Sequence, residues 1–383
     1  MTSEAVLSSR EPSAAVGRAV ADLETPALVI DLAVLDANIA RMVATARQAG
    51  GRLRPHVKTH RMAAVASRLQ RAGAEGICCA KVGEAEAFAD AGFDDIFIAN
   101  QVVGASRLIR LVELAERTRL AVGVDHAEHV RALGTAFAAA DATIDVSIEI
   151  DTGQGRTGVA DSESAVALAK QTLGADGLNL RGIYTHEGHD YQAAEPAGVH
   201  VAAEESQHLM TTVAQAIQDA TGAPCEVSMG SSPSFLLESF HAPIDELRPG
   251  TAVFNDASHA HLLGHADWCA ATVLATVVNL PAPDRVVIDA GAKALTSDRR
   301  GPGVLENTGH GMVVGHPEAV ITSVSDEHGV IAAPDAGAFA IGQTLRVIPN
   351  HICPCVNLYD HAFAARDGIV EAVWHVTARG RSQ

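Results

Sequence analysis

The sequence predicts a (β/α)8 barrel followed by a mainly antiparallel β domain, and two patterns indicate this fold class. Between about residues 50 and 256, eight short apolar runs alternate with amphipathic helical stretches. Such alternation is typical of βα units with a parallel sheet, and a closed barrel of this type needs eight strands. After about residue 268, strand-like runs follow one another with little helix between them. We expect the barrel at residues 25–262 and the β domain at residues 1–24 and 263–383.

Each barrel run is followed by a helical pattern. The eight runs lie at residues 52–58, 76–81, 95–100, 120–125, 145–151, 180–186, 226–230 and 248–254. A ninth run at residues 27–31, followed by a helical pattern through Leu35, Ile39 and Met42, lies outside this set. In the second half, strands are expected at residues 270–280, 285–289, 319–325, 345–349 and 370–376. No repeat or Pro/Gly linker separates the halves, so their boundary near residues 257–268 stays open.

Composition and charge exclude several classes of function. The 383 residues are 48% hydrophobic, which is enough for a large packed core. A net charge of −18 disfavours nucleic acid and anionic membrane partners, because both need basic patches. The start of the chain has no signal-like apolar segment, and no run approaches the roughly 18 apolar residues of a membrane span. We expect a cytoplasmic enzyme with reduced cysteines and a small substrate.

Lys58 is the first candidate for chemistry. It ends the first barrel run, and side chains at the carboxyl ends of barrel strands face the active site. A lysine amine there can bond covalently to a carbonyl group of a cofactor. An isolated lysine after a strand is more often a solvated loop charge, so the neighbouring residues decide between the two interpretations.

Segments around Lys58 resemble one group of enzymes. Residues 25–32 (TPALVIDL), 54–60 (RPHVKTH) and 83–86 (GEAE) are similar to the alanine-racemase-like, fold-type III pyridoxal phosphate enzymes. Within that group the chain resembles the D-threonine aldolase and D-serine dehydratase family, in order along nearly its whole length. The resemblance implies an alanine racemase-like fold in which Lys58 binds pyridoxal 5'-phosphate and the ninth run joins the β domain. It also implies a homodimer that acts on a small D-amino acid.

Two turns after later strands are candidates for binding the cofactor phosphate. Residues 228–234 (SMGSSPS) combine backbone N–H groups with hydroxyls at a strand-to-helix turn, which suits a phosphate. Residues 248–251 (RPGT) form the next such turn. The resemblance assigns the phosphate contacts to Gly230, Ser231, Ser232, Gly250 and Thr251. Without it, each turn would be an ordinary Gly/Ser turn.

A third turn, residues 153–158 (GQGRTG), matches the G-x-G-x-x-G dinucleotide fingerprint. A Rossmann fingerprint opens the first βα unit and is followed after about 20 residues by an acid, and neither condition is met here. An NAD-dependent oxidoreductase is therefore a weak alternative. The resemblance instead directs Arg156 toward the phenolic oxygen of the cofactor, whereas the simpler interpretation is a solvated turn arginine.

The loop at residues 184–191 (YTHEGHDY) follows another barrel run. Its His-Glu-x-His pattern is not a zincin motif, because His186 and His189 are three residues apart and not four. It is similar to the loop of dehydratase-type members, which implies a catalytic role for His189 and cofactor contacts for Tyr184 and Tyr191. The alternative, that the histidines only line a polar loop, stays open.

His351 and Cys353 are candidate metal ligands in the β domain. They occupy alternate positions at the expected exit of a strand, so their side chains are predicted to lie on one side. Imidazole and thiolate favour zinc, with manganese, cobalt and magnesium as alternatives. A lone H-x-C is usually a coincidence, but the resemblance makes it the expected metal pair. Two protein ligands would leave positions for water and substrate.

The candidate residues support two lyase reactions on a D-β-hydroxy-α-amino acid. Removal of the Cα proton by Lys58 with loss of the hydroxyl gives a keto acid and ammonia, as in a D-serine or D-3-hydroxyaspartate dehydratase. Removal of the hydroxyl proton instead gives glycine and an aldehyde, as in D-threonine aldolase. Cys353 and the His189 loop resemble dehydratases, whereas residues 354–360 resemble aldolases, so the dehydratase is favoured only slightly. An amino-acid racemase with Tyr359 as its acid is a further alternative.

Overall fold

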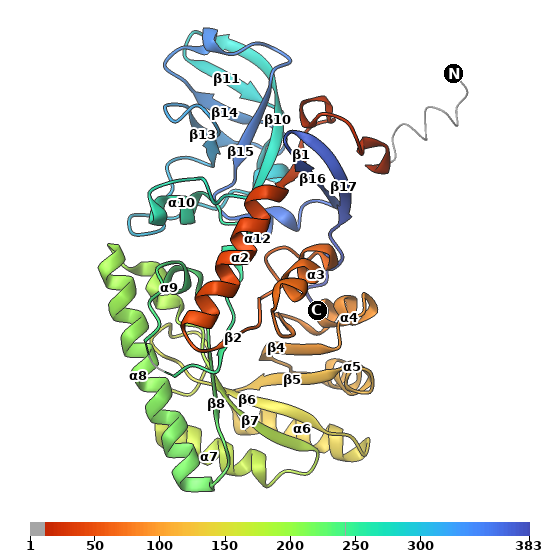
Figure 1. Cartoon of the computed structure of the whole chain (residues 1–383), viewed down its shortest axis with the longest axis vertical. Helices are drawn as coiled ribbons and strands as arrows, with labels where there is room; N and C mark the ends of the chain where they lie inside the picture. Colours follow the sequence, from red (N-terminus) through yellow and green to blue (C-terminus); the bar gives the residue numbers. More distant parts are fainter. Residues whose placement is uncertain (1–11, 242) are drawn as a thin grey trace, which may run out of the picture. The chain divides into compact units, whose positions relative to one another are not determined.

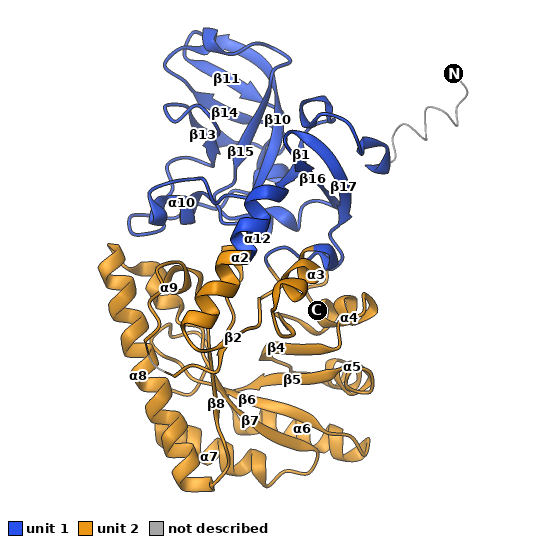
Figure 2. Cartoon of the chain, viewed as in Figure 1, with its two compact units in different colours: residues 1–39, 59–64, 253–379 blue, residues 40–58, 65–252, 380–383 orange. Residues whose placement is uncertain are grey.

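The computed structural model describes residues 12–241 and 243–383, and the chain forms two compact units (Figures 1 and 2). Residues 1–11, which were expected in the β domain, lie outside the described residues. Compared with the expected division, residues 25–39, 59–64 and 253–262 fall in unit 1 and not with the barrel, and residues 380–383 fall in unit 2. Of the described residues, unit 1 comprises 12–39, 59–64 and 253–379, and unit 2 comprises 40–58, 65–241, 243–252 and 380–383.

Unit 2 contains the parallel barrel. Its strands pair in the order β2-β9-β8-β7-β6-β5-β4-β3. An isolated parallel bridge between His56 and Cys78, with Val57 N–H donating to Cys78 O at 2.8 Å, links the two ends of this sheet. The predicted barrel is therefore confirmed. The strands are β2 (Arg52–Leu53), β3 (Ile77–Cys79), β4 (Asp95–Gln101), β5 (Arg119–Val124), β6 (Ile144–Glu149), β7 (Leu178–Tyr184), β8 (Glu226–Met229) and β9 (Glu246–Leu247).

Helices alternate with these strands along the chain (Figure 1). The longest of those described, α8, begins with Pro196 at its first position and is capped at its C-terminus by Gly222, whose φ of 70° is left-handed. A proline start and a left-handed glycine end are favourable because proline needs no N–H there and glycine has no Cβ. The helices are α3 (Ala63–Ala72), α4 (Val82–Asp90), α5 (Ala105–Ala115), α6 (Ala127–Ala139), α7 (Ser162–Leu173), α8 (Pro196–Thr221) and α9 (Ser232–Leu236).

The eighth barrel strand is earlier and shorter than predicted. The strand is β9, and the run at residues 248–254 follows it as a loop with the 3-10 turn Thr251–Val253. Pro249 has no N–H to donate to a sheet, which breaks the strand. Val253 and Phe254 are apolar because they are buried in the loop's packing, not because they belong to a strand.

Unit 1 contains a nine-stranded sheet in the order β11-β14-β13-β12-β15-β10-β1-β16-β17. The ninth run predicted in the sequence forms β1, which pairs antiparallel with β10 and parallel with β16. It thus joins this sheet, as the resemblance implied. The strands are β1 (Ala27–Asp31), β10 (Ala271–Ala282), β11 (Arg285–Ile288), β12 (Met312–Val313), β13 (Val320–Val324), β14 (Gly329–Ala332), β15 (Thr344–Ile348), β16 (His361–Arg366) and β17 (Ile369–His375). The α-helices that lie wholly or partly in this unit are α2 (Leu32–Gln48), the start of α3, α10 (Ala257–Leu263), α11 (Ala292–Leu295) and α12 (Ile352–Val356).

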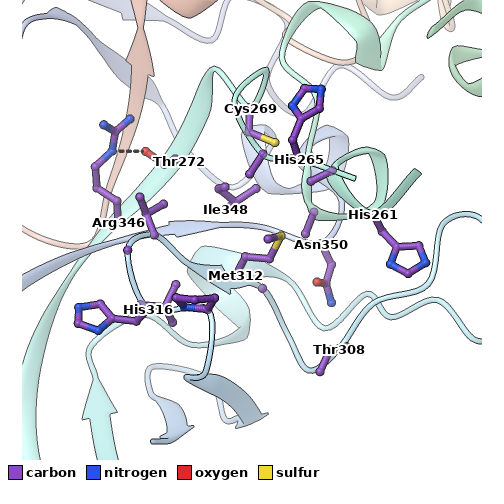
Figure 3. A pocket seen from close by; sticks show the side chains of 18 of the residues that line it. His261, His265, Cys269, Thr272, Thr308, Met312, His316, Arg346, Ile348 and Asn350 are labelled. Carbon is purple, nitrogen blue, oxygen red and sulfur yellow. Dashed lines mark hydrogen bonds between the residues drawn. The ribbon is translucent and has the colours of Figure 1, made fainter. Parts of the chain in front are cut away.

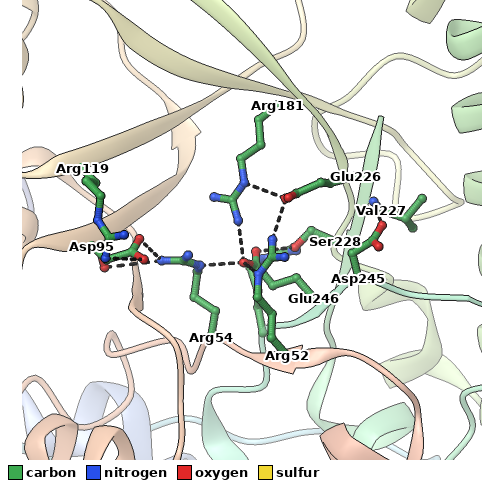
Figure 4. A network of polar contacts seen from close by, with 11 residues as sticks. Arg52, Arg54, Asp95, Arg119, Arg181, Glu226, Val227, Ser228, Asp245 and Glu246 are labelled. Atoms are coloured by element: carbon green, nitrogen blue, oxygen red, sulfur yellow. Dashed lines mark hydrogen bonds and ion pairs between the residues drawn. The ribbon is translucent and has the colours of Figure 1, made fainter. Parts of the chain in front are cut away.

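An ionic network crosses the inside of the barrel (Figure 4). Its centre is Glu246, which is fully buried and accepts hydrogen bonds from Arg54 Nε at 2.6 Å, Arg181 Nη2 at 2.7 Å and Arg52 Nε at 3.1 Å. Burial acts to raise the pKa of Glu246, but the surrounding guanidinium groups hold it below the ordinary range. Ser228 also donates to Glu246, at 2.7 Å, so the network includes a hydroxyl of β8.

Among the helices that the structure describes, none is both long and apolar enough to cross a membrane.

Candidate active site

Lys58 follows β2 and lies among neutral imidazoles. Burial lowers the pKa of His186 to about 3, and the positive charge of Lys58 acts in the same direction. Burial and the charges of Lys58 and Arg248 also lower the pKa of His56 well below its ordinary value. His186 Nδ1 lies 3.0 Å from Gly230 O. Because a carbonyl only accepts, Nδ1 carries the proton, and Nε2 keeps a lone pair.

Arg248 is a buried arginine that was not among the predicted site residues. Its Nη2 donates to Thr185 O at 2.6 Å, and its Nη1 donates to Ser228 Oγ. Its guanidinium lies 5.3 Å from the Tyr184 ring centroid and 5.6 Å from that of Phe97, within cation–π range. The signal that could have found it is an arginine directly after a barrel strand and before Pro-Gly.

Tyr184 and Arg156 meet at one carboxylate. Tyr184 is buried and donates to Glu149 Oε2 at 3.0 Å, while Arg156 Nη2 lies 3.7 Å from Glu149 Oε1. Gln101 also donates to Glu149, at 2.5 Å. Burial, and then the charge of Glu149, raise the pKa of Tyr184 well above its ordinary value, so its hydroxyl stays protonated. Glu149 therefore connects two predicted cofactor residues.

The two turns predicted to hold the phosphate are joined. Thr251 N–H donates to Ser232 Oγ at 3.2 Å, so the turn that contains Gly250 and the turn after β8 are in contact. A Cβ on Gly230 would lie 2.8 Å from the Arg248 backbone, so only glycine fits there. Ser231 and Ser232 are buried. The predicted phosphate residues thus form one group.

The loop after β7 carries His189 and Tyr191 on the 3-10 turn η3 (Gly188–Gln192). The His189 ring packs over Gly153, where a Cβ would lie 3.4 Å from it. Its Nδ1 is buried and has no hydrogen-bond partner within residues 12–241 and 243–383. Tyr191 makes an edge contact with His186, with ring centroids 5.7 Å apart. The predicted site residues of unit 2 all follow barrel strands or, like Tyr184, end one.

The predicted metal ligands belong to unit 1, where the secondary structure differs from the prediction. Cys353 lies in α12 and His351 is the residue before that helix, so alternation along a strand does not explain their proximity. His351 Nδ1 lies 2.9 Å from Asp298 Oδ2, and Cys353 Sγ lies 3.3 Å from Thr59 Oγ1. Burial acts to lower the pKa of His351, but the hydrogen bond and charge of Cys353 and the charge of Asp256 raise it to about 9.

These two side chains fit an open metal site. Asp298 holds one nitrogen of His351, which leaves Nε2 for an ion, the arrangement usual for metal-binding histidines. The described part of the chain contains no group of three or more His, Cys, Asp or Glu side chains placed around one metal position. An ion held by these two side chains alone would take other ligands, such as water, in its remaining positions.

A separate cavity of about 690 Å³ in unit 1 lies beside β12 and β15 (Figure 3). His261, His265, His316 and Arg346 contribute to its lining, and Arg346 Nε donates to Thr272 at 3.0 Å. None of the residues predicted for catalysis, cofactor or metal lines it.

Family models match both parts of the chain. Residues 30–258 match the alanine racemase N-terminal domain, and residues 270–365 match a putative serine dehydratase domain. The chain belongs to the alanine racemase N-terminal domain family. This confirms the predicted family.

Relatives of this alanine-racemase-like protein include both aldolases and dehydratases. D-threonine aldolase from Arthrobacter sp. is 36% identical, with 97% of each chain covered. The structure of D-threonine aldolase from Filomicrobium marinum superposes with a TM-score of 0.88 at 33% identity, over 96% of this chain and 99% of that one. The structure of D-threo-3-hydroxyaspartate dehydratase from Delftia sp. HT23 superposes with a TM-score of 0.86 at 34% identity, over 93% of this chain and 98% of that one. A structure of a cysteine-to-alanine variant of D-threo-3-hydroxyaspartate dehydratase is described as its metal-free form.

Proposed function

We propose that the protein is a pyridoxal-phosphate-dependent lyase that acts on D-β-hydroxy-α-amino acids and carries its cofactor on Lys58. The observation that carries the proposal is the placement of this amine among neutral imidazoles, at the strand ends that also present the Gly230 and Thr251 turns. The donor set fits the cofactor, because an amine can take the aldehyde while amides and hydroxyls take the phosphate. Full-length relatives with these activities support it.

The chain's own residues would have separate roles in this reaction. When bound, pyridoxal phosphate accepts electron density from the substrate Cα, and a divalent cation supplies Lewis acidity at the β-hydroxyl. The Lys58 amine would act as the base that takes the Cα proton. His189, whose buried Nδ1 has no partner in the part of the chain that the structure describes, exchanges a proton with the substrate. His351 and Cys353 hold the cation, with zinc favoured by the thiolate over manganese, cobalt or magnesium.

We propose elimination to a keto acid and ammonia as the main reaction, because a cysteine stands at the second metal position. Retro-aldol cleavage to glycine and an aldehyde is the second candidate, favoured by the 36% identity to a D-threonine aldolase over nearly the whole chain. A racemase gains no support, because Tyr359 already donates its hydroxyl to Ala294 O at 2.9 Å.

Product analysis distinguishes these reactions. Purified protein supplied with cofactor and Zn²⁺ or Mn²⁺ is incubated with D-serine, D-threonine or D-threo-3-hydroxyaspartate, with L-enantiomers and a chelated sample as controls. Keto acid and ammonia, lost on chelation, support the dehydratase. Glycine and aldehyde support the aldolase, and the absence of both product pairs from every D-substrate would contradict a lyase.

A cysteine pair provides a matched control for the metal. Cys353→Ala removes the proposed ligand and should abolish metal-dependent turnover. Cys355→Ala removes a buried thiol two residues away, which donates to Ala294 O at 3.2 Å, and should retain metal binding. Equal metal affinity in both variants would remove Cys353 from the site. We also propose a cytoplasmic homodimer, for which light scattering of the purified protein tests the oligomeric state.

A further inference from the structure

Two acidic side chains lie behind the turn proposed to hold the cofactor phosphate. Glu187 and Asp190 belong to the loop after β7, and both are fully buried. Glu187 Oε2 accepts from Gly230 N–H at 3.2 Å, and Glu187 Oε1 accepts from Ser234 Oγ at 3.1 Å. The first acid therefore binds the start of the phosphate turn and the first turn of α9 together.

Asp190 binds the same turn at two further points. Its Oδ2 lies within hydrogen-bond distance of Ser231 Oγ and accepts from Ser234 N–H at 3.2 Å. Its Oδ1 is buried and has no partner among the residues that the structure describes. Ser231 is also the N-cap of α9, and its hydroxyl lies 2.8 Å from that of Ser234. Asp190 is thus in hydrogen-bond contact with Ser231, the N-cap residue of α9.

The charges around Asp190 favour its neutral form. Burial, and then the negative charge of Glu187, raise the pKa of Asp190 to about 8, and burial also raises the pKa of Glu187. The first turn of α9 contacts Asp190 through the Ser231 hydroxyl and the Ser234 amide. The positive charge of Arg248 acts to lower the pKa of the neighbouring Glu187. His200 of α8 lies 2.9 Å from the Ser239 hydroxyl. A neutral carboxyl can donate to Ser231 and adds no second negative charge beside a phosphate.

We propose that Asp190 is a positioning residue for the cofactor phosphate: through its contacts with Ser231 Oγ and Ser234 N–H it holds the first turn of α9 in place. The inference rests on the proposed function, because it requires pyridoxal phosphate on Lys58. Ser232 and the Gly250–Thr251 turn, which are joined by the hydrogen bond from Thr251 N–H to Ser232 Oγ, would supply donors on the other side of the phosphate. Asp190 itself makes no contact with the phosphate.

The test compares pyridoxal phosphate with pyridoxal, which lacks the phosphate. Equilibrium dialysis gives the affinity for pyridoxal phosphate divided by the affinity for pyridoxal. This ratio is measured for the wild-type protein and for Asp190→Asn and Asp190→Ala. Asp190→Ala should lower the ratio about tenfold at pH 7, since a buried hydroxyl and amide lose their partner. Asp190→Asn is neutral and keeps an acceptor, so its ratio should stay within about threefold of the wild type.

The pH dependence separates this role from a purely structural one. From pH 7 to 9.5 the wild-type ratio should fall about fivefold as Asp190 loses its proton and adds a negative charge. The phosphate itself has a second pKa of about 6 and does not titrate in this range. Asp190→Asn cannot ionise, so its ratio should not change with pH. Asp161→Ala is the control for loss of an acid at a helix start, because the exposed Asp161 is the N-cap of α7 and accepts from Ser164 N–H and Oγ, and it should leave the ratio unchanged.

Each outcome decides the inference. A ratio that is the same in Asp190→Ala and wild type, or a loss in Asp190→Asn as large as in Asp190→Ala, would overturn it while leaving the proposed function intact. Failure of both cofactor forms to bond to Lys58 would overturn the inference and the proposed function together. If Asp190→Ala does not fold, the comparison of Asp190→Asn with the wild type between pH 7 and 9.5 decides the inference: a ratio that changes equally with pH in both would overturn it.

Discussion

Replacing Glu246 by glutamine should destabilise the barrel strongly. Glu246 is fully buried and accepts from Arg52, Arg54 and Arg181, so its loss leaves three guanidinium groups with less counter-charge. Removing one partner of a buried ion pair costs about 3–5 kcal/mol. Arg54 keeps its ion pair with Asp95 at 2.6 Å. We therefore expect the free energy of unfolding to fall by about 3 kcal/mol, near the low end of this range.

Glu226→Gln is the matched control. Glu226 also binds Arg52 and Arg181, at 2.5 and 2.9 Å, but its side chain is 39% exposed. Its loss should cost no more than about 1 kcal/mol, because solvent screens such a pair. A cost for Glu246→Gln within about 1 kcal/mol of the control would refute the reasoning.

Urea unfolding followed by far-ultraviolet circular dichroism measures both variants. The helices that alternate with the barrel strands dominate this signal, whereas Trp268 and Trp374 lie in unit 1 and report on that unit by fluorescence. Separate transitions by the two probes would be analysed separately, since a two-unit chain need not unfold in one step. Because the folded pKa of Glu246 is depressed, its contribution is fully present above the unfolded value of about 4.5 and decreases as pH falls below it. The difference in the free energy of unfolding between the wild type and Glu246→Gln should therefore become smaller as the pH falls below about 4.5.

Three further changes test the site. Lys58→Ala should abolish the absorbance of bound cofactor and lower the rate by about a thousandfold or more, and turnover near the wild-type rate would contradict its role. Asp298→Asn should weaken metal binding about 10- to 100-fold by calorimetry, since Asp298 orients His351, and an unchanged affinity would assign Asp298 no such role. Gly230→Ala should cost about 1–3 kcal/mol and weaken cofactor binding because its Cβ would meet backbone, whereas Gly301→Ala, with nothing within 4 Å, should have no effect.

Local patterns were sufficient to predict the architecture and the residues that follow the carboxyl ends of the barrel strands. Alternating apolar runs and amphipathic stretches mark βα units whatever the details of packing, so the barrel was found from the sequence. The carboxyl ends of parallel strands lie together, so Lys58, His189 and Gly230 could be placed at one edge. The prediction was wrong for the run at residues 248–254, where an apolar loop held by tertiary packing resembles a strand and Pro249 interrupts it.

Contacts between distant residues could not be predicted in this way. His351 and Cys353 were paired by strand alternation, yet Cys353 lies in a helix and the partner of His351 is Asp298, 53 residues earlier. The contacts of Asp190 with Ser231 and Ser234 span more than 40 residues and follow no periodicity. Such hydrogen bonds are determined by how the elements pack, which a single sequence pattern does not encode.

Covalent trapping of the cofactor tests the central claim most directly. Protein incubated with pyridoxal phosphate is reduced with borohydride, digested and analysed by mass spectrometry, before and after addition of a D-β-hydroxy-α-amino acid. We predict a pyridoxyl group on Lys58, which decreases when the substrate is present because the substrate displaces this lysine. A label on another lysine, or none, would contradict the account.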